Sequence, residues 1–401
     1  MLQFIRYALV FILGSISEVG SGPTLNGDVG KSEPAIATKK TQIIAKNTSQ
    51  PTGWPMHRGG PQLNGQVNES VAEKLRLRWV FDTGGPIKSS AAVEHNLIFI
   101  GSDTGYVHAL EINSGLEIWS FETEGEVEAT PCVVNDTVYI GSSDNYFYAL
   151  SMMTGELKWK YRTEGRILGA ANWVLNPNGN GYWILFGSYD GSLYCVDAET
   201  GQTVWKHKTE YYVNGTPAIT QGGEVVFGGC DANIYILRLS DGAELRKFDS
   251  GAYIAGSIAV ADGSGYVGHY NNEVLAFDLK SVEIIWIYGK NSFPYFSSAA
   301  VTPDRVVIGS RDKQLHCINR FTGEGLWQFQ AQGTIDSSPI VCGNLIVFGS
   351  NDGRLYSVNL LDGKMVWSYD IGAPVTASPA FAHGKIVIGA EDGSVYVFDA
   401  S

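Results

Sequence analysis

Eight short apolar segments, each closed by a glycine, recur along the chain at a nearly constant spacing. The closing glycines lie 40, 46, 41, 40, 41, 40 and 40 residues apart, at Gly101, Gly141, Gly187, Gly228, Gly268, Gly309, Gly349 and Gly389. A period near forty residues, rich in β-branched and aromatic side chains and in glycine turns, is typical of a propeller built from four-stranded blades. The repeat therefore predicts an all-β chain with eight blades and no helix after its first residues.

A tryptophan marks the last strand of almost every unit. The series is Trp79, Trp119, Trp159, Trp205, Trp286, Trp327 and Trp367, with Arg246 in the one place where the tryptophan is missing. The eighth unit ends at Ser401 before it reaches this position, whereas residues 78–83, ahead of the first unit, repeat the pattern of a last strand. We therefore expect an eight-bladed β-propeller of four-stranded antiparallel blades in which this N-terminal strand completes the last blade and leaves no open sheet edge.

Five segments follow a more specific pattern, in which a small residue, an Asp or Asn (absent from residues 149–159), a Gly and a terminal Trp follow one another. They are residues 109–119, 149–159, 195–205, 317–327 and 357–367. This pattern resembles the tryptophan-docking repeat of the pyrroloquinoline-quinone (PQQ) propeller superfamily. That superfamily has WD40-like repeats and includes the quinoprotein alcohol dehydrogenase-like proteins. The resemblance covers about residues 75–401 and implies that each Trp packs against the next blade.

The superfamily has two branches with different functions. One contains dehydrogenases that hold PQQ and a calcium ion; the other contains scaffolds, notably the propeller subunit of the outer-membrane β-barrel assembly machinery. A chain of 401 residues has room for eight minimal blades and little else, and its five cysteines are neither adjacent nor spaced for haem or zinc. The resemblance therefore implies a scaffold with no catalytic residues, no metal and no cofactor, closest in size and layout to the assembly-machinery subunit.

Two alternatives stay open. One is a PQQ-dependent alcohol or sugar dehydrogenase, or a PQQ-binding protein, with PQQ and calcium as cofactors; the other is a polysaccharide-binding propeller. No phosphate-binding loop, nucleophile elbow, zinc-protease motif or calcium loop is found in the sequence.

The N-terminus indicates export. A short basic start is followed by an apolar run over residues 7–16, the length of a signal-peptide core and too short for a membrane span. We expect a signal peptide over residues 1–17, a flexible linker over 18–52 and the propeller over 53–401. The mature protein would then be periplasmic or extracellular, without a transmembrane span. No cysteine follows the apolar run, so the lipid attachment typical of the assembly-machinery subunit is missing.

The segment Gly53–Gly60 resembles the lead-in strap of PQQ-like propellers. His57 and Arg58 are candidate ligands in it, but a packed strap with Arg58 at the surface is the favoured interpretation. The net charge of −13, from 28 basic and 41 acidic residues, excludes nucleic acid as a partner, because no basic stripe is present to neutralise phosphates. Envelope proteins are the expected partners.

Two columns of loop residues break the eightfold symmetry and are therefore the candidate ligand or partner face. The first column, ahead of the inner strands, contains Lys88, Glu128, Leu168, Asn214, Ala255, Phe296, Asp336 and Thr376. The second, between the second and third strands, contains Asp103, Ser143, Tyr189, Cys230, Tyr270, Arg311, Asn351 and Glu391. Asp103, Asn351 and Glu391 are polar candidates on this face.

Within these columns, two interpretations compete. Lys88, Glu128, Asn214 and Asp336 could hold a quinone tricarboxylate or a calcium ion, or could line a water-filled channel mouth. A second set in the columns consists of Tyr189, Tyr270, Phe296 and Arg311. These residue types are enriched in protein interfaces, so the set could form a partner surface, or its members could be ordinary exposed side chains.

Blades three to five depart most from the repeat. Residues 176–181 insert between the first two strands of the third blade, Arg246 replaces a docking Trp, and Ser281-Val282 stand where Thr-Gly is usual. Arginine loosens the packing at that position unless its guanidinium stacks or finds a carboxylate. Cys230, in an expected turn, is the candidate reactive thiol.

Overall fold

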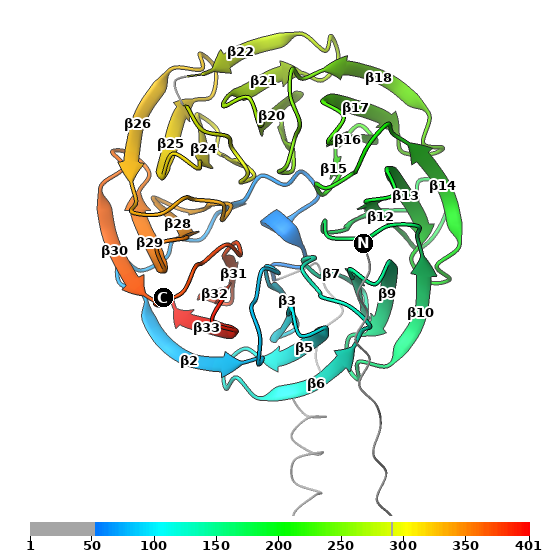
Figure 1. The fold of residues 1–401 in the computed structure, drawn as a ribbon, viewed down its shortest axis with the longest axis horizontal. Helices are drawn as coiled ribbons and strands as arrows, with labels where there is room; N and C mark the ends of the chain where they lie inside the picture. Colours follow the sequence, from blue (N-terminus) through cyan, green and yellow to red (C-terminus); the bar gives the residue numbers. More distant parts are fainter. Residues whose placement is uncertain (1–52, 290–291) are drawn as a thin grey trace, which may run out of the picture. The chain divides into compact units, whose positions relative to one another are not determined.

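The computed structural model describes residues 53–289 and 292–401, which form eight blades around a common centre (Figure 1). The predicted signal peptide and linker lie outside the described residues. Within the described chain the helical structure is a single three-residue 3-10 turn, η1 (His57–Gly59), and no helix is long and apolar enough to cross a membrane. The predicted eight-bladed all-β architecture is confirmed.

Each blade contains four antiparallel strands, ordered from the centre outward, and one blade has a fifth strand besides these. The innermost strands are β3 (Ala92–Glu94), β7 (Cys132–Val134), β11 (Asn172–Leu175), β15 (Ala218–Ile219), β19 (Ala259–Ala261), β23 (Ala300–Val301), β27 (Ile340–Cys342) and β31 (Ala380–Ala382). The second strands are β4 (Leu97–Gly101), β8 (Thr137–Gly141), β12 (Tyr182–Ser188), β16 (Glu224–Gly228), β20 (Ser264–Gly268), β24 (Arg305–Gly309), β28 (Leu345–Ser350) and β32 (Lys385–Gly389). The third strands are β5 (Tyr106–Glu111), β9 (Tyr146–Ser151), β13 (Ser192–Asp197), β17 (Asn233–Arg238), β21 (Val274–Asp278), β25 (Gln314–Asn319), β29 (Arg354–Asn359) and β33 (Ser394–Asp399). The outer strands are β6 (Glu117–Glu122), β10 (Leu157–Arg162), β14 (Thr203–Lys208), β18 (Glu244–Asp249), β22 (Ile284–Tyr288), β26 (Gly325–Gln330), β30 (Met365–Asp370) and β2 (Arg76–Asp82).

The periodic glycines allow neighbouring blades to approach closely. A Cβ at Gly101 would lie 2.3 Å from the side chain and 2.4 Å from the backbone oxygen of Val127 in the next blade. At Gly141 the same atom would lie 2.2 Å from Ile167. Since both partners are completely buried, the glycine spacing reflects the blade-to-blade contacts at the core.

The ring closes as the tryptophan series predicts. Strand β2 pairs antiparallel with β33, and Trp79 lies opposite Val397 in the position that the other blades give to their own tryptophan. Ala72, just ahead of β2, also donates its amide to the carbonyl of Ala400 at 2.7 Å. The segment just ahead of the first repeat and the C-terminal strand are thereby joined within one sheet.

Six of the seven docking tryptophans, all but Trp367, make the same two contacts with the next blade. The indole ring covers a glycine at positive φ, such as Gly115 (φ 72°) or Gly323 (φ 72°). The Nε1–H of the indole donates to the carbonyl of the residue three positions before that glycine. The six hydrogen bonds, 2.8 to 3.1 Å long, join Trp79 to Ile112, Trp119 to Met152, Trp159 to Ala198, Trp205 to Leu239, Trp286 to Arg320 and Trp327 to Leu360. Side chains at these glycines would meet the indole, because a Cβ there lies 2.5 to 2.8 Å from ring atoms.

The two departures noted at blades four and five are one coupled change. Arg246 replaces the tryptophan of β18, and Val282 replaces the glycine that it would cover, at a φ of 56°. A β-branched residue at positive φ is strained, and its Cβ would collide with an indole in the usual place. Arg246 forms an ion pair with Glu224 instead, so the replacing guanidinium does find a carboxylate.

A strap, residues 53–71, follows the inner edges of the innermost strands. Backbone carbonyls of the strap accept hydrogen bonds from residues of seven blades. The pairs are Trp54 with Val93, Pro55 with Val133, Pro61 with Asn172 and Ile219, Gln62 with Val260, Asn64 with Val301 and Gly65 with Val341. The innermost strands otherwise leave backbone N–H groups unpaired toward the channel. The strap accepts hydrogen bonds from such groups in six blades, and in blade three it accepts one from the Asn172 side chain.

The strap adds two features that the sequence did not predict. Its strand β1 (Gln66–Val67) pairs parallel with β27, so blade seven has five strands instead of four. Arg58 is buried, with 3% of its surface exposed, which makes the prediction of a surface arginine wrong. Its Nη2 donates to the carbonyl of Ala299 at 3.1 Å, and burial lowers its pKa to about 9. The guanidinium lies against Gly65, where a Cβ would be 1.9 Å from Nη2.

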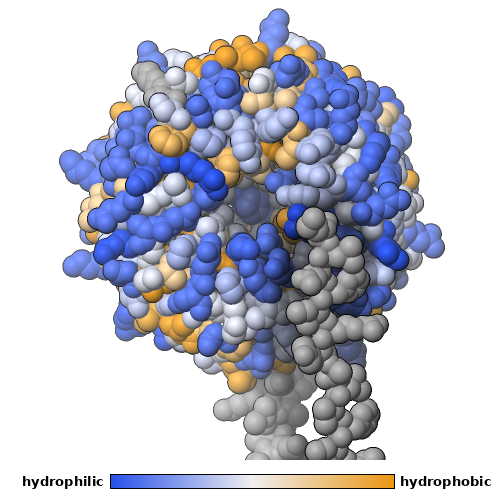
Figure 2. All heavy atoms as spheres, viewed as in Figure 1, coloured by the Kyte–Doolittle hydropathy of each residue, from blue (hydrophilic) through white to orange (hydrophobic). Residues whose placement is uncertain are grey.

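The face seen in Figure 2 is mostly polar around a hollowed centre, and apolar atoms gather at the rim over β22. The sequence of this outer strand explains the apolar rim, because Ile284, Ile285 and Ile287 are each 44 to 51% exposed. The insertion over residues 176–181 lies between β11 and β12, as predicted, and Leu175 beside it is exposed.

The Arg246–Val282 change predicts a strongly non-additive pair of substitutions. Arg246→Trp alone should destabilise the protein because the indole meets the Val282 side chain. Together with Val282→Gly it should restore the docking contact, with a coupling free energy of about 1 to 2 kcal/mol. Chemical denaturation of the four variants of this cycle measures the coupling.

Gly323→Val is the matched control in a regular blade. It should lower stability by itself, because Trp286 is already in place 2.7 Å from the new Cβ and the backbone φ is 72°. A strictly additive cycle at 246 and 282 would contradict the docking explanation.

A second prediction concerns acid stability. Desolvation, reinforced by the charge of Arg58, lowers the pKa of His57 to about 3 from its ordinary 6.5. Between these values the unfolded chain binds a proton that the folded chain excludes, so the stability of the fold decreases as the pH falls through this range. His57→Gln should reduce the pH dependence of the unfolding midpoint between pH 6 and 4, a range inside that window. An unchanged slope would show that His57 is not the responsible group.

Candidate functional site

The two columns of loop residues lie on one face of the ring, which we call the mouth face. In each blade the amide of the second-column residue donates to the carbonyl two residues before the first-column residue. The eight bonds, 2.8 to 3.1 Å long, join Asp103 to Pro86, Ser143 to Glu126, Tyr189 to Arg166, Cys230 to Tyr212, Tyr270 to Tyr253, Arg311 to Pro294, Asn351 to Thr334 and Glu391 to Pro374. The backbone therefore holds both columns in a constant frame while the side chains vary.

Blades one and two place a cation between two carboxylates on this face. The Nζ of Lys88 lies 2.8 Å from Asp103 and 3.0 Å from Glu128. Burial by itself would lower the pKa of Lys88, but the hydrogen bonds and charges of the two carboxylates outweigh it and raise the pKa. Lys88 is therefore already neutralised within the protein.

A second ionic group lies on blades six and seven. Arg311 contacts both oxygens of Asp336, at 2.9 and 3.1 Å, which is the bidentate geometry that makes such pairs specific. The Asn351 amide donates to Asp336 at 3.2 Å, and in blade eight Thr376 donates to Glu391 at 3.0 Å. These predicted residues are thus brought together in neighbouring pairs rather than around one central point.

Between the ionic groups, blades three to six carry a series of aromatic side chains that we call the aromatic arc. It consists of Tyr189, Tyr211, Tyr212, Tyr253, Tyr270 and Phe296. Ring centroids are 4.7 Å apart for Tyr189–Tyr212, 4.3 Å for Tyr211–Tyr212, 6.2 Å for Tyr253–Tyr270 and 4.7 Å for Tyr270–Phe296. Four of the six tyrosine and phenylalanine side chains are at least 37% exposed: Tyr211, Tyr212, Tyr253 and Tyr270.

An arginine lies at each end of the arc. The guanidinium carbon of Arg166 is 5.2 Å from the centre of the Tyr189 ring, and that of Arg311 is 3.7 Å from the centre of the Phe296 ring. Both distances are within the range of cation–π attraction. The contacts hold the terminal rings in place, so the arc is presented in an ordered arrangement.

Sequence reasoning named three of the six aromatic residues and missed Tyr211, Tyr212 and Tyr253, together with Arg166. Tyr212, Tyr253 and Arg166 each lie two residues before the first column, at the carbonyl that accepts the repeated hydrogen bond. A third aligned column at this position would have found them. Asn214 lies near Tyr189 in the same region.

The cysteines do not provide a reactive group on this face. Cys195 and Cys317 are completely buried, opposite Trp205 and Trp327 in their sheets, as expected for small core residues. Cys230 is partly buried, and desolvation, followed by the charge of Asp231, raises its pKa. A raised pKa reduces the thiolate fraction, which does not support the prediction of a reactive thiol.

The mouth-face residues do not fit PQQ and calcium. Lys88 and Arg311 are each already paired with carboxylates, so a quinone tricarboxylate would approach an acidic surface. Leu168, Ala255 and Phe296 interrupt the ring of possible oxygen ligands. Over residues 53–289 and 292–401, no three His, Cys, Asp or Glu side chains gather as a metal site would need.

Comparison with protein families gives two matches. Residues 171–401 match the family model described as the β-propeller of the beta-alanine-activating enzyme, and residues 64–186 match the model described as outer membrane protein assembly factor BamB. No curated protein matches the sequence.

Several solved structures share the fold. BamB from Moraxella catarrhalis is 19% identical over 81% of this chain and 100% of its own, with a TM-score of 0.70. The quinohemoprotein alcohol dehydrogenase ADHIIG from Pseudomonas putida HK5 is 14% identical over 89% of this chain and 83% of its own, with a TM-score of 0.74. A computationally designed protein, Ika8, is 19% identical with a TM-score of 0.72. At these identities the similarity concerns the fold.

The pairing of Lys88 makes a prediction about quinone binding. Addition of PQQ and calcium chloride to the purified protein should give neither a stoichiometric bound-quinone spectrum nor a shift in melting temperature. The double variant Asp103→Asn, Glu128→Gln frees Lys88 and should bind PQQ more tightly than the wild type, because the competing carboxylates are gone. A stoichiometric quinone spectrum in the wild-type protein would contradict this reading of the mouth face.

Proposed function

We propose that this chain is a non-catalytic platform that binds protein in the cell envelope. The chain belongs to the β-propeller family of the beta-alanine-activating enzyme and is a PQQ-like propeller resembling BamB. The aromatic arc of the mouth face is the binding surface. The exposed, ordered row of rings across four blades is the observation that supports this role.

The arc has the composition of a binding surface. Tyrosine, phenylalanine and arginine are enriched at the centres of protein interfaces, and aromatic and arginine side chains dominate the binding free energy when they become desolvated. Tyr212, Tyr253 and Tyr270 remain 37 to 54% exposed in the isolated chain, so a partner can still remove much of their surface from water. The flanking ion pairs of Lys88 and Arg311 supply a polar rim.

The scaffold favours such a role for a second reason. Each arc residue is on a loop whose backbone is fixed by the repeated hydrogen bond between the columns. Binding then requires little ordering of the backbone, and this reduces the entropic cost of association. A large partner can contact four blades at once without rearranging the propeller.

Export to the periplasm or the cell exterior is the second part of the proposal. It is supported by the signal-peptide pattern over residues 1–17 and by the similarity of residues 64–186 to the assembly-factor model. Outer-membrane protein assembly is the process in which we place the platform. A PQQ-dependent dehydrogenase remains the alternative because dehydrogenases share the fold, and polysaccharide binding by the arc is the second alternative.

Site-specific crosslinking in the native cell tests the proposal. A photoreactive benzoyl-phenylalanine at Tyr270 should form a discrete protein adduct upon irradiation. The same residue at Phe321, which is 68% exposed in the turn after β25 on the opposite face, is the matched control and should not. In the Tyr212→Ala background the adduct yield should fall about tenfold or more, as expected when an interface aromatic is removed.

Two outcomes would contradict the platform function. One is an equal set of adducts from both faces, and the other is the absence of any protein adduct at Tyr270 in cells that contain the full envelope. Dye-linked oxidation of alcohols or sugars by the PQQ-loaded protein would support the dehydrogenase instead.

A further inference from the structure

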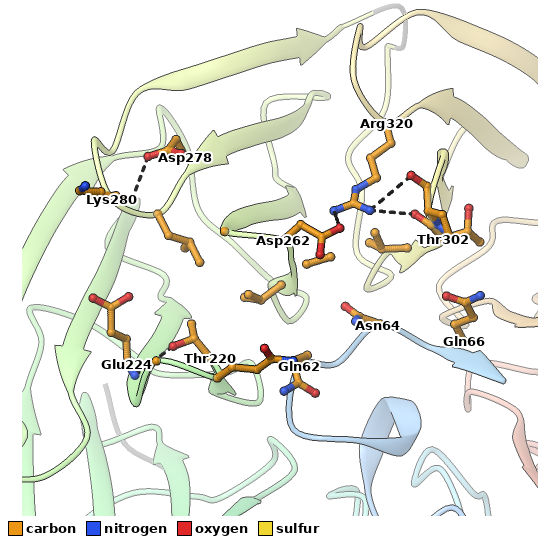
Figure 3. Close-up of a pocket in the computed structure, with 18 of the residues that line it drawn as sticks. Gln62, Asn64, Gln66, Thr220, Glu224, Asp262, Asp278, Lys280, Thr302 and Arg320 are labelled. Carbon is orange, nitrogen blue, oxygen red and sulfur yellow. Dashed lines mark hydrogen bonds and ion pairs between the residues drawn. The ribbon is translucent and has the colours of Figure 1, made fainter. Parts of the chain in front are cut away.

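A cavity of about 980 Å³ opens between blades four, five and six on the face opposite the mouth, which we call the strap face (Figure 3). One wall is formed by Gln62, Asn64 and Gln66 of the strap, and the others by the turns that follow β15, β19 and β23. None of the column residues of the mouth face lines it. We propose that this cavity is a second binding site, whose ligand is a neutral oligosaccharide.

The cavity lies where the docking pair of blades four and five is missing. Arg246 and Leu279 both line it. By the pattern of the other blades, a tryptophan at position 246 would donate its Nε1–H to the carbonyl of Leu279, three residues before Val282. An indole in that position would therefore occupy part of the space. The change from Trp and Gly to Arg and Val therefore leaves open a part of the space that the cavity occupies.

The ionic groups that line the cavity neutralise one another. Three acidic residues, Glu224, Asp262 and Asp278, stand against three basic ones, Arg246, Lys280 and Arg320. Glu224 pairs with Arg246, and Asp262 pairs with Arg320 at 2.8 Å, as the dashed line in Figure 3 marks. A lining without net charge gives no preference for phosphates, other anions or metal cations.

Arg320 makes one wall of the cavity rigid. Its side chain is 5% exposed and donates to the hydroxyl of Tyr266 at 2.9 Å and to the carbonyls of Thr302 and Pro303 at 3.3 and 3.4 Å. Desolvation by itself would lower the pKa of Arg320, but the hydrogen bonds and charges of Tyr266 and Asp262 outweigh it and raise the pKa. The carboxylate of Asp262 is thereby oriented while 85% of its side chain stays exposed and able to accept further hydrogen bonds.

Other polar groups keep free hydrogen-bonding capacity. Among the residues that the structure describes, no bond to the carboxamides of Gln62 and Gln66 is found. The buried Nε–H of Arg246 also has no acceptor there. Thr220 accepts the amide of Glu224 at 3.0 Å and can still donate its hydroxyl proton. Carboxamides and hydroxyls both donate and accept, so the wall offers both kinds of group together.

This combination fits a sugar better than other ligand classes. The vicinal hydroxyls of a saccharide each donate and accept, which matches carboxamide, carboxylate and guanidinium groups at fixed positions. A lipid would need a larger apolar lining than the small patches of Val260, Ala261, Leu279 and Val301. The volume is near the upper end of the usual range for ligand pockets, roughly 300 to 1,000 Å³, so it accommodates several linked rings.

Binding to an array of neutral di- to hexasaccharides, with uronic-acid oligosaccharides as the charged comparison, tests the proposal on the purified protein. We expect the wild type to bind at least one neutral glycan. Gln62→Leu removes a free carboxamide from the cavity wall and should weaken that binding at least tenfold. Gln202→Leu, at an exposed glutamine in the turn before β14, is the matched control and should leave it unchanged.

The double variant Arg246→Trp, Val282→Gly is the decisive second measurement. It should fill part of the cavity, retain the fold and abolish glycan binding. Because the aromatic arc lies on the opposite face, Tyr270→Ala should leave glycan binding intact, and the crosslinking result at Tyr270 is independent of this site.

Four results would overturn the proposal. They are the absence of any glycan binding, preferential binding of uronic-acid glycans, full binding by a correctly folded Arg246→Trp, Val282→Gly variant, and loss of binding in Tyr270→Ala. The last result would instead move saccharide recognition to the aromatic arc.

Discussion

The contact of an outer-strand tryptophan with a positive-φ glycine of the next blade, made at six of the eight blade junctions, is the interaction on which this structure depends. It combines burial of an indole with a directed hydrogen bond, as for Trp286 on Gly323 and the carbonyl of Arg320. Repeated around the ring, it fixes the angle between neighbouring sheets. The glycine has no side chain, so the ring and the backbone carbonyl can both be reached. Where this pair is lost, Arg246 and Leu279 line a cavity.

The strap solves a different problem from the tryptophans. Blade-to-blade docking buries the sheets, but it leaves the inner edges of the innermost strands without partners. The strap bonds to strand amides in six blades and to the Asn172 side chain in a seventh, and it places the polar Gln62 and Asn64 on the wall of the cavity. The two faces consequently differ: the mouth face carries loops that project side chains, whereas the strap face carries a cavity with a fixed wall.

Much of the fold was predictable because the same residue types recur at the same positions in all eight repeats. The glycine period gave the blades, and residues 78–83 gave the strand that closes the ring. The candidate site was predictable only in part, since an alignment of two columns found Tyr189, Tyr270 and Phe296 but not Tyr212 or Tyr253. The burial of Arg58 could not be predicted, because it depends on which blades surround the strap. The coupled change at positions 246 and 282 could not be predicted from the sequence either, because the two residues belong to different repeats.

The sequence by itself determined the number of blades, the place of the four strands of each blade and the way in which the ring closes, because these follow from local periodicity and turn chemistry. Only the tertiary structure decided which side chains meet. The stacking of Tyr189 on Tyr212, the pairing of Lys88 with Glu128 and the cavity beside Arg246 all join residues of different loops or blades. Such contacts depend on the angle and spacing of neighbouring sheets, which are properties of the packed ring rather than of any single repeat.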